Sequence, residues 1–232
     1  MDIKVLASGS KGNCYMVDNG KTPLLLECGI KFKDIQRGLN FQVAKLAGCL
    51  ISHEHGDHSK AAGDLMRAGI RCYMSQGTQE MLKLSGHYVK TIEAGRKFFV
   101  GSWAVLPFGV QHDAREPLGF LLANQTGEKL LYATDTYYLR FRFQGLTHIM
   151  LEVNYSADIL RENVSSGALP PVMQNRIVRS HMGLETALEL LRANDLSSVR
   201  EIHLLHLSDG NADAERFKRE IQELTGKPVY IA

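Results

Sequence analysis

Short apolar runs that end in polar residues recur along the first third of the chain. The runs Ile3–Ala7 and Leu46–Ile51 are rich in aliphatic residues, which is typical of buried strands. Amphipathic or polar-faced stretches predict short helices at 33–39, 59–68 and 76–84. This order of strands and helices predicts an α/β fold, although no residue-level internal repeat is visible.

The centre of the chain has a different pattern. From Phe98 to Tyr132, apolar runs are separated by glycines, which predicts several antiparallel strands. An amphipathic helix is predicted at 184–193. Between these regions, Arg161–Arg179 is the least regular part of the chain, with Ser165-Ser166-Gly167 followed by Pro170-Pro171, and it lies in a possible lid or flap at 156–180. Its composition favours a lid or flap over a core element, and an arm that forms a homodimer is the alternative.

Composition narrows the picture further. A chain of 232 residues with 44% hydrophobic content can bury one large core, so we expect a single domain over 1–232. A net charge of +2 is far from the strongly basic balance of a nucleic-acid coat, so any binding of a polyanion must be local. With no signal-like start and no long apolar span, we expect a cytoplasmic protein without a membrane segment. Four cysteines without C-x-x-C spacing predict free thiols: Cys14, Cys28, Cys49 and Cys72.

A group of closely spaced residues that can bind a metal ion follows the run Leu46–Ile51. Four ligand-type residues fall within six positions, namely His53, His55, Asp57 and His58. Imidazole and carboxylate favour zinc, iron or manganese over calcium, and the lack of a nearby thiol argues against a closed structural zinc site. The first two histidines can face one ion, and the two residues after Gly56 can turn toward a second. The alternative is a polar helix start with a chance run of histidines.

A cluster of four residues cannot complete two coordination shells, and the chain offers more ligands downstream. His112, Asp135 and His206 each lie at or just beyond the end of an apolar run. α/β folds gather their sites at such strand ends. Taken singly, either histidine is as often a buried core residue as a ligand, but together with the first cluster each becomes a candidate ligand.

The ordered set H-x-H-x-D-H, then His, Asp and a final His, resembles the metallo-β-lactamase superfamily. Further stretches are similar to its YycJ/WalJ-type branch: Val5–Asn13, Gly109–Ala114, Thr134–Thr136 and Leu205–Ser208. That branch is associated with 5′-to-3′ exonuclease activity on DNA. The resemblance covers nearly the whole chain. It implies a four-layer αβ/βα sandwich of mixed sheets with helices on the outer faces and two divalent metal ions, zinc or manganese.

The resemblance also implies a complete set of metal ligands. The ligands of one ion would be His53, His55 and His112. The ligands of the other would be Asp57, His58 and His206, with Asp135 as a bridge. Two ions can share a hydroxide that attacks the phosphorus, and Asp57 would orient it as a catalytic residue. Glu27 stands where the family usually has Asp, and its longer arm can still reach a ligand histidine.

Substrate contacts are implied less firmly. Ser10 and Asn13 lie in a glycine loop that can offer backbone N–H groups to a phosphate, and an ordinary hairpin turn is the alternative. Asn154 matches a substrate-binding position, although Tyr155 replaces the family's histidine beside it. His181, before a helix, resembles a residue assigned to phosphate contact and leaving-group protonation, and a helix cap is the alternative reading.

The stretch Tyr137–Phe143 interleaves aromatic residues with arginines. Rings and guanidinium groups of this kind bind single strands and terminal bases, whereas the alternative places the rings in the core. The sequence thus predicts a metal-dependent DNA exonuclease. A small-molecule phosphodiesterase on the same fold, acting for example on cyclic nucleotides, is the second candidate.

Overall fold

The structure is a computed structural model that describes residues 1–232. The chain divides into two compact units. The first unit comprises Met1–Gly109 and Ala114–Glu128, and the second comprises Val110–Asp113 and Lys129–Ala232. The expectation of a single domain over 1–232 stays a prediction.

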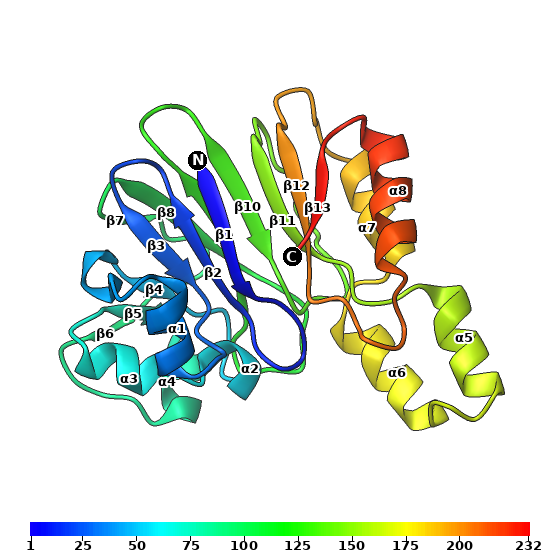
Figure 1. Cartoon of the computed structure of the whole chain (residues 1–232), viewed down its shortest axis with the longest axis horizontal. Coiled ribbons are helices and arrows are strands. Elements are labelled where there is room, and N and C mark those ends of the chain that lie inside the picture. Colours follow the sequence, from blue (N-terminus) through cyan, green and yellow to red (C-terminus); the bar gives the residue numbers. More distant parts are fainter. The chain divides into compact units, whose positions relative to one another are not determined.

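The first unit contains a six-stranded sheet whose strands lie in chain order (Figure 1). The strands are β1 (Asp2–Ala7), β2 (Cys14–Asp18), β3 (Pro23–Leu26), β4 (Cys49–Leu50), β5 (Cys72–Met74) and β6 (Val89–Thr91). The first three pair antiparallel, and β3 to β6 pair parallel, so the sheet is mixed. Three more strands form an antiparallel meander: β7 (Phe98–Val100), β8 (Trp103–Gly109) and β9 (Leu118–Ala123).

The helices of this unit are short. They are α1 (Phe32–Gly38), α2 (Gly56–Ser59), α3 (Ala62–Arg67) and α4 (Gln76–Leu82), with a 3-10 turn at Val43–Lys45. The helix predicted at 59–68 therefore begins earlier and is broken near Ala61, where the backbone leaves helical geometry. The helix predicted at 76–84 ends early because Lys83 takes a left-handed conformation with φ of 52°.

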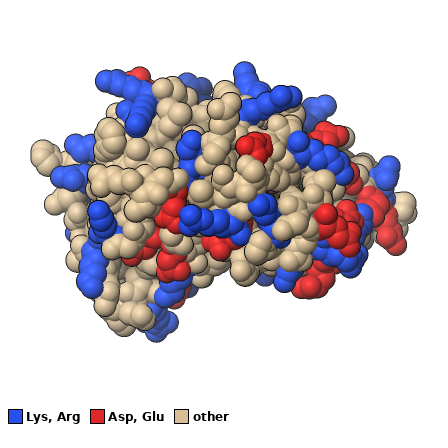
Figure 2. All heavy atoms as spheres, turned by 90° about the horizontal axis from the view of Figure 1, so that it is seen from above, with Lys and Arg blue, Asp and Glu red and all other residues tan.

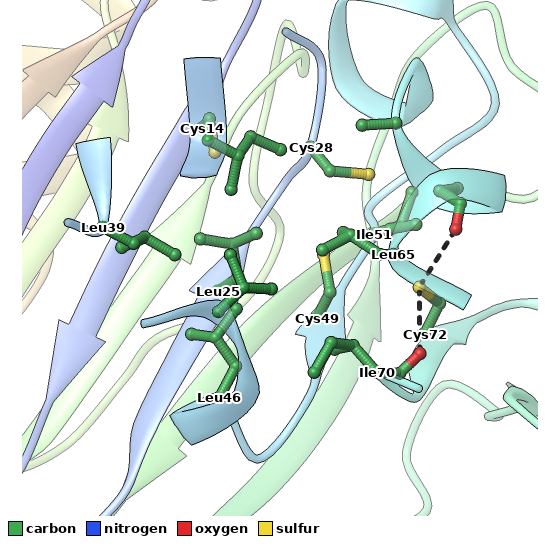
Figure 3. Close-up of a cluster of buried hydrophobic side chains, with 14 of the residues drawn as sticks. Cys14, Leu25, Cys28, Leu39, Leu46, Cys49, Ile51, Leu65, Ile70 and Cys72 are labelled. Atoms are coloured by element: carbon green, nitrogen blue, oxygen red, sulfur yellow. Dashed lines mark hydrogen bonds between the residues drawn. The ribbon is translucent and has the colours of Figure 1, made fainter. Parts of the chain in front are cut away.

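A core of aliphatic side chains and thiols fills the space beside the parallel strands of the first unit. Leu25, Ile51 and Leu65 are fully buried there together with all four cysteines (Figure 3). The Cys72 thiol lies 3.7 Å from the Ala62 carbonyl oxygen. The cysteines are free, as predicted, and behave as small apolar residues of the core.

The second unit has a parallel run of four strands in the order β13-β12-β11-β10. Their bounds are β10 (Lys129–Ala133), β11 (His148–Glu152), β12 (Glu201–Leu205) and β13 (Val229–Ile231). Every residue of β11 is buried, as expected for a strand in the middle of a parallel sheet. The helices are α5 (Ala157–Ser165), α6 (Pro171–Ser180), α7 (Leu184–Arg192) and α8 (Ala214–Thr225). Of these, α8 contacts both α7 and β13 (Figure 1).

The segment 156–180 is more regular than its composition indicates. It folds as α5 and α6, which contact one another as a helical hairpin (Figure 1). Pro171 opens α6, a position where proline's fixed φ suits a helix and its missing N–H costs nothing. The predicted irregular flap is therefore wrong as secondary structure, and the role of a lid stays a prediction. No helix in the structure has both the length and the apolar character needed to cross a bilayer.

We expect the thiols of the folded protein to be unreactive. Burial raises the pKa of Cys14, Cys28 and Cys49, so little thiolate forms near pH 8 and reagent cannot reach it. Ellman's reagent should titrate fewer than one thiol per chain within minutes in buffer and all four cysteines in guanidinium. Rapid reaction of two or more thiols in the folded protein would contradict this core.

Candidate metal centre

The first unit carries a cluster of imidazoles and one carboxylate where β4 leads into α2. His53 and His58 are buried, and their ring centroids lie 4.2 Å apart. His53 Nε2 lies 3.1 Å from His55 Nδ1, and Asp57 Oδ2 lies 3.4 Å from His58 Nε2. We call these four residues the first cluster. Imidazoles that face one another this closely, beside a carboxylate and without a thiolate, suit a shared cation.

Backbone contacts hold the first cluster from behind. Asn13 N–H donates to the Asp57 carbonyl at 2.7 Å, and Cys28 N–H donates to the His58 carbonyl at 2.8 Å. Gly29 lies so close that an added Cβ would stand 1.6 Å from the Asp57 carbonyl oxygen. Only glycine fits at this position, so the ligand loop sits directly on the chain that follows β3.

Glu27 extends this support, and the predicted hydrogen bond from its side chain to a ligand histidine stays a prediction. Its carboxylate accepts the Ser52 N–H at 3.2 and 3.3 Å and lies 3.6 Å from His58 Nδ1. The side chain is fully buried, and the backbone of Glu27 has φ of 62°. A non-glycine residue in this region is strained, and such strain concentrates at functional sites.

The second unit gathers its own cluster at the carboxyl ends of three neighbouring parallel strands. Asp135 follows β10, Glu152 ends β11 and His206 follows β12. Asp135 Oδ1 lies 2.7 Å from His206 Nδ1, and Asp135 Oδ2 lies 3.5 Å from His112 Nε2. Asp135 and His206 also have positive φ, at 44° and 53°. We call Asp135, Glu152, His181 and His206 the second cluster.

Glu152 is the residue of this cluster that the sequence analysis missed. It is fully buried, with Oε1 at 2.6 Å from His181 Nδ1 and 3.2 Å from His206 Nδ1. Its Oε2 accepts the backbone N–H of Thr136 at 2.9 Å. The signal was present, because a lone carboxylate ends the apolar run of β11 at the same sheet edge as Asp135 and His206.

The carboxylates control the charge of the histidines. Although burial disfavours the imidazolium, Asp135 and Glu152 raise the pKa of His206 to about 10. Burial likewise opposes the charge on His181, yet Glu152 raises its pKa. Burial lowers the pKa of His112 despite the neighbouring Asp135. A metal ion needs neutral imidazoles, so its uptake at the second cluster releases protons.

The predicted substrate residues occupy different places. Asn13 is buried, and its amide lies 3.2 Å from His58 Nε2. Asn154 is buried and donates to the His206 carbonyl at 2.8 Å. Ser10 is exposed. Contact of these three residues with substrate stays a prediction, and in the structure the two asparagines contact the predicted ligand residues His58 and His206.

His181 lies where α6 ends. Its N–H donates to the Ile177 carbonyl, whereas the cap of α7 is Gly183, so the alternative of His181 as an N-terminal cap is wrong. The Ser180 carbonyl at the same helix end lies 2.9 Å from His112 Nδ1. An imidazole whose Nδ1–H is held by a carbonyl presents Nε2 as the ligand atom. The end of α6 therefore orients His112 and places His181.

The residues fit divalent metal ions. In the second cluster, one ligand atom from each of four residues lies within 4.8 Å of the others: Asp135, Glu152, His181 and His206. Imidazole and carboxylate donors, backed by further carboxylates that fix their orientation, are the usual surroundings of zinc and manganese. Both clusters thus have the chemistry of ligands rather than of a satisfied apolar core.

Comparison with known proteins agrees with this chemistry. The sequence matches the family profile described as "Beta-lactamase superfamily domain" over residues 24–206. The chain belongs to the β-lactamase superfamily. The metallo-β-lactamase fold protein YhfI from Bacillus subtilis is 18% identical, has a TM-score of 0.75 and is matched over 99% of this chain and 95% of its own. This likeness confirms the predicted α/β fold with mixed sheets and helices.

Two superfamily relatives are more similar in sequence. "Exodeoxyribonuclease YycJ" of Bacillus anthracis is 28% identical, with 97% of this chain and 89% of the relative covered. "Exodeoxyribonuclease WalJ" of Streptococcus pneumoniae is 30% identical, with coverages of 89% and 81%. They confirm the resemblance to the YycJ/WalJ-type branch, and the chain is a metal-dependent hydrolase.

Gly29→Ala should damage the first cluster. Its Cβ would overlap the Asp57 carbonyl oxygen, so the ligand loop must shift. We expect a loss of about 3 kcal/mol in unfolding free energy and at least a roughly tenfold loss of metal affinity, measured by denaturation and by metal content after dialysis. Gly63→Ala in α3 is the control, since its Cβ meets nothing closer than 3.5 Å. Equal metal content in both variants would contradict the close approach.

Glu152→Gln should weaken the second cluster. The amide is neutral, and its NH2 group cannot accept the Thr136 N–H as Glu152 Oε2 does, so metal affinity should fall about 10- to 100-fold. Isothermal titration with Zn²⁺ and Mn²⁺ measures this. Glu201→Gln is the matched control, because Glu201 also contacts a histidine, His203 at 3.2 Å, but outside both clusters. If the two variants bind metal equally, Glu152 does not orient the ligands.

Proposed function

We propose that this protein is a metal-dependent nuclease that removes nucleotides from the 5′ ends of DNA. Both relatives with 28% and 30% identity carry the name exodeoxyribonuclease, and the match spans most of each chain. The observation that carries the proposal is the second cluster, in which the buried Glu152 holds two histidines beside Asp135. Such a cluster suits the hydrolysis of a negatively charged ester, a reaction that needs both cations and a proton donor.

We further propose that the two clusters together hold two divalent ions, zinc or manganese. The ligands of one would be His53, His55 and His112. The ligands of the other would be Asp57, His58 and His206, with Asp135 between them. When bound, two such ions lower the pKa of water toward about 7 and stabilise charge on the attacking and leaving oxygens of a phosphodiester.

The chain's own residues would then have separate tasks. Asp57 would orient the nucleophile, since its backbone is fixed by Asn13 and by the close approach of Gly29. His181 would give a proton to the departing alkoxide. Its Nδ1 is engaged by Glu152 at 2.6 Å, which leaves Nε2 as the nitrogen for transfer. Ser10, exposed in its turn, is the candidate for contact with a phosphate oxygen.

A compact phosphodiesterase acting on cyclic nucleotides is the second candidate. The net charge is only +2, and on the face seen in Figure 2 Lys and Arg side chains are interspersed with Asp and Glu. No broad basic surface is visible on that face. A polymer is attracted by such a surface, whereas a small substrate does not need one.

Digestion of end-labelled linear duplex DNA beside a covalently closed circle separates these functions. Metal-stripped protein should become active when zinc or manganese is restored, and Asp135→Ala should lose at least about a thousandfold in rate because a shared ligand is gone. We expect loss of the linear DNA from its 5′ end, with the circle intact.

Survival of both DNAs with every metal, together with cleavage of a cyclic nucleotide, would contradict the exonuclease and support the compact phosphodiesterase.

Salt dependence gives a second criterion. A polymer-binding enzyme loses affinity steeply with salt, because each phosphate contact releases about one counterion, whereas a small-pocket enzyme is much less sensitive.

A further inference from the structure

The segment Tyr137–Phe143, which we call the aromatic-arginine segment, begins directly after the ligand residue Asp135 in the second unit. Tyr137 N–H donates to the Gln111 carbonyl at 3.1 Å. Thr136 Oγ1 donates to the Tyr138 carbonyl at 2.9 Å and accepts from Gln111 N–H at the same distance. The start of the segment is therefore tied to the loops that carry both His112 and Asp135.

The rings of this segment are divided between the core and solvent. Leu139 and Phe143 are buried, and Phe143 N–H donates to the Asn194 side chain at 2.6 Å. Tyr138 and Phe141 are exposed by 52% and 39%. The segment forms neither helix nor strand, yet it is anchored at both ends. Large rings held outward on an anchored backbone can bind a partner with little loss of entropy.

A hollow of about 240 Å³ lies between the segment and α7. Its walls include two rings, two guanidinium groups, a hydroxyl and a carboxylate: Tyr138, Phe141, Arg140, Arg142, Thr186 and Glu189. Both arginines are exposed. The hollow thus offers flat apolar faces, an excess of positive charge and hydrogen-bonding groups of both kinds.

We propose that the aromatic-arginine segment binds an unpaired nucleobase and its adjoining phosphates in the DNA strand that the enzyme digests. The inference rests on the proposed nuclease function and adds the form of its substrate. A base would stack on Tyr138 or Phe141, Arg140 and Arg142 would contact phosphates, and the Glu189 carboxylate would accept from an exocyclic amino group. Rings beside arginines are the composition of single-strand binding sites.

The position of the segment agrees with this role. Tyr138 is three residues beyond Asp135, so at most about 11 Å of backbone separates them. A base held there lies within a few nucleotides of a phosphodiester at the second cluster. The enzyme should therefore prefer single-stranded or frayed ends over blunt duplex ends.

Binding to two strands of equal length tests the stacking. Fluorescence anisotropy of the metal-loaded protein would compare a hydrolysis-resistant phosphorothioate oligodeoxycytidylate, whose bases carry an exocyclic amino group, with an abasic strand of the same backbone. Wild type should bind the base-bearing strand roughly tenfold tighter or more. The double variant Tyr138→Ala/Phe141→Ala should lose that advantage and keep its affinity for the abasic strand. Tyr230→Ala, an exposed tyrosine on β13, is the control.

The arginines should behave differently. Arg140→Gln/Arg142→Gln should weaken the binding of both strands. It should also reduce the slope of log affinity against log salt by about 1.4, at about 0.7 for each phosphate contact on a single strand. Arg219→Gln on α8 is the control for a lost exposed charge. Thermal unfolding should change little in these variants because none of the replaced side chains is buried.

Hydrolysis of bis-(p-nitrophenyl) phosphate separates this inference from the proposed function. The aromatic variant should retain that hydrolysis and lose activity on single-stranded ends. Equal binding of both strands by wild type and the aromatic variant would overturn the stacking site while leaving the nuclease intact. A change in oligomeric state without a change in DNA affinity would also overturn it, since the rings would then bind a second copy. Absence of any phosphodiester hydrolysis by wild type would refute the nuclease itself.

Discussion

The buried carboxylate of Glu152 is the group on which the second cluster depends. A carboxylate without solvent is costly unless it is paired and hydrogen-bonded. Glu152 meets this condition through two imidazoles and two backbone N–H groups, those of Thr136 and Met182. These partners come from the loop after β10, from the loop between α6 and α7, and from the loop after β12. One acid at the end of β11 therefore fixes three loops at once.

Both clusters contain or adjoin residues with a strained backbone. Glu27, Asp135 and His206 all have positive φ without being glycine. Each such residue costs about 1–3 kcal/mol and persists only where surrounding contacts over-determine it. Asn154 supplies one such contact to the His206 carbonyl, and Ser52 N–H supplies another to the Glu27 side chain. Preorganised ligands of this kind do not have to move when a cation arrives.

Two parts of the second unit adjoin residues of the second cluster. The hairpin of α5 and α6 ends at Ser180, whose carbonyl orients His112, and His181 follows directly. Arg176 on α6 lies 3.6 Å from Asp113. The aromatic-arginine segment follows Asp135 in the chain, and its last residue, Phe143, donates its backbone N–H to the Asn194 side chain. Modest net charge is compatible with a nuclease when the contacts to the strand are few, local and next to the metals.

The candidate ligand residues, their order and the fold family could be predicted from the sequence alone. His53, His55, Asp57 and His58 are recognisable because their spacing is local and follows an apolar run, and Asp135 and His206 because they follow strands. The tertiary structure decided what depends on partners far apart in the chain. Glu152 meets His206 across 54 positions, and Asn13 meets Asp57 across 44. It also decided that 156–180 contains two helices, and which rings of Tyr137–Phe143 face solvent, because burial depends on neighbouring elements that a local pattern does not encode.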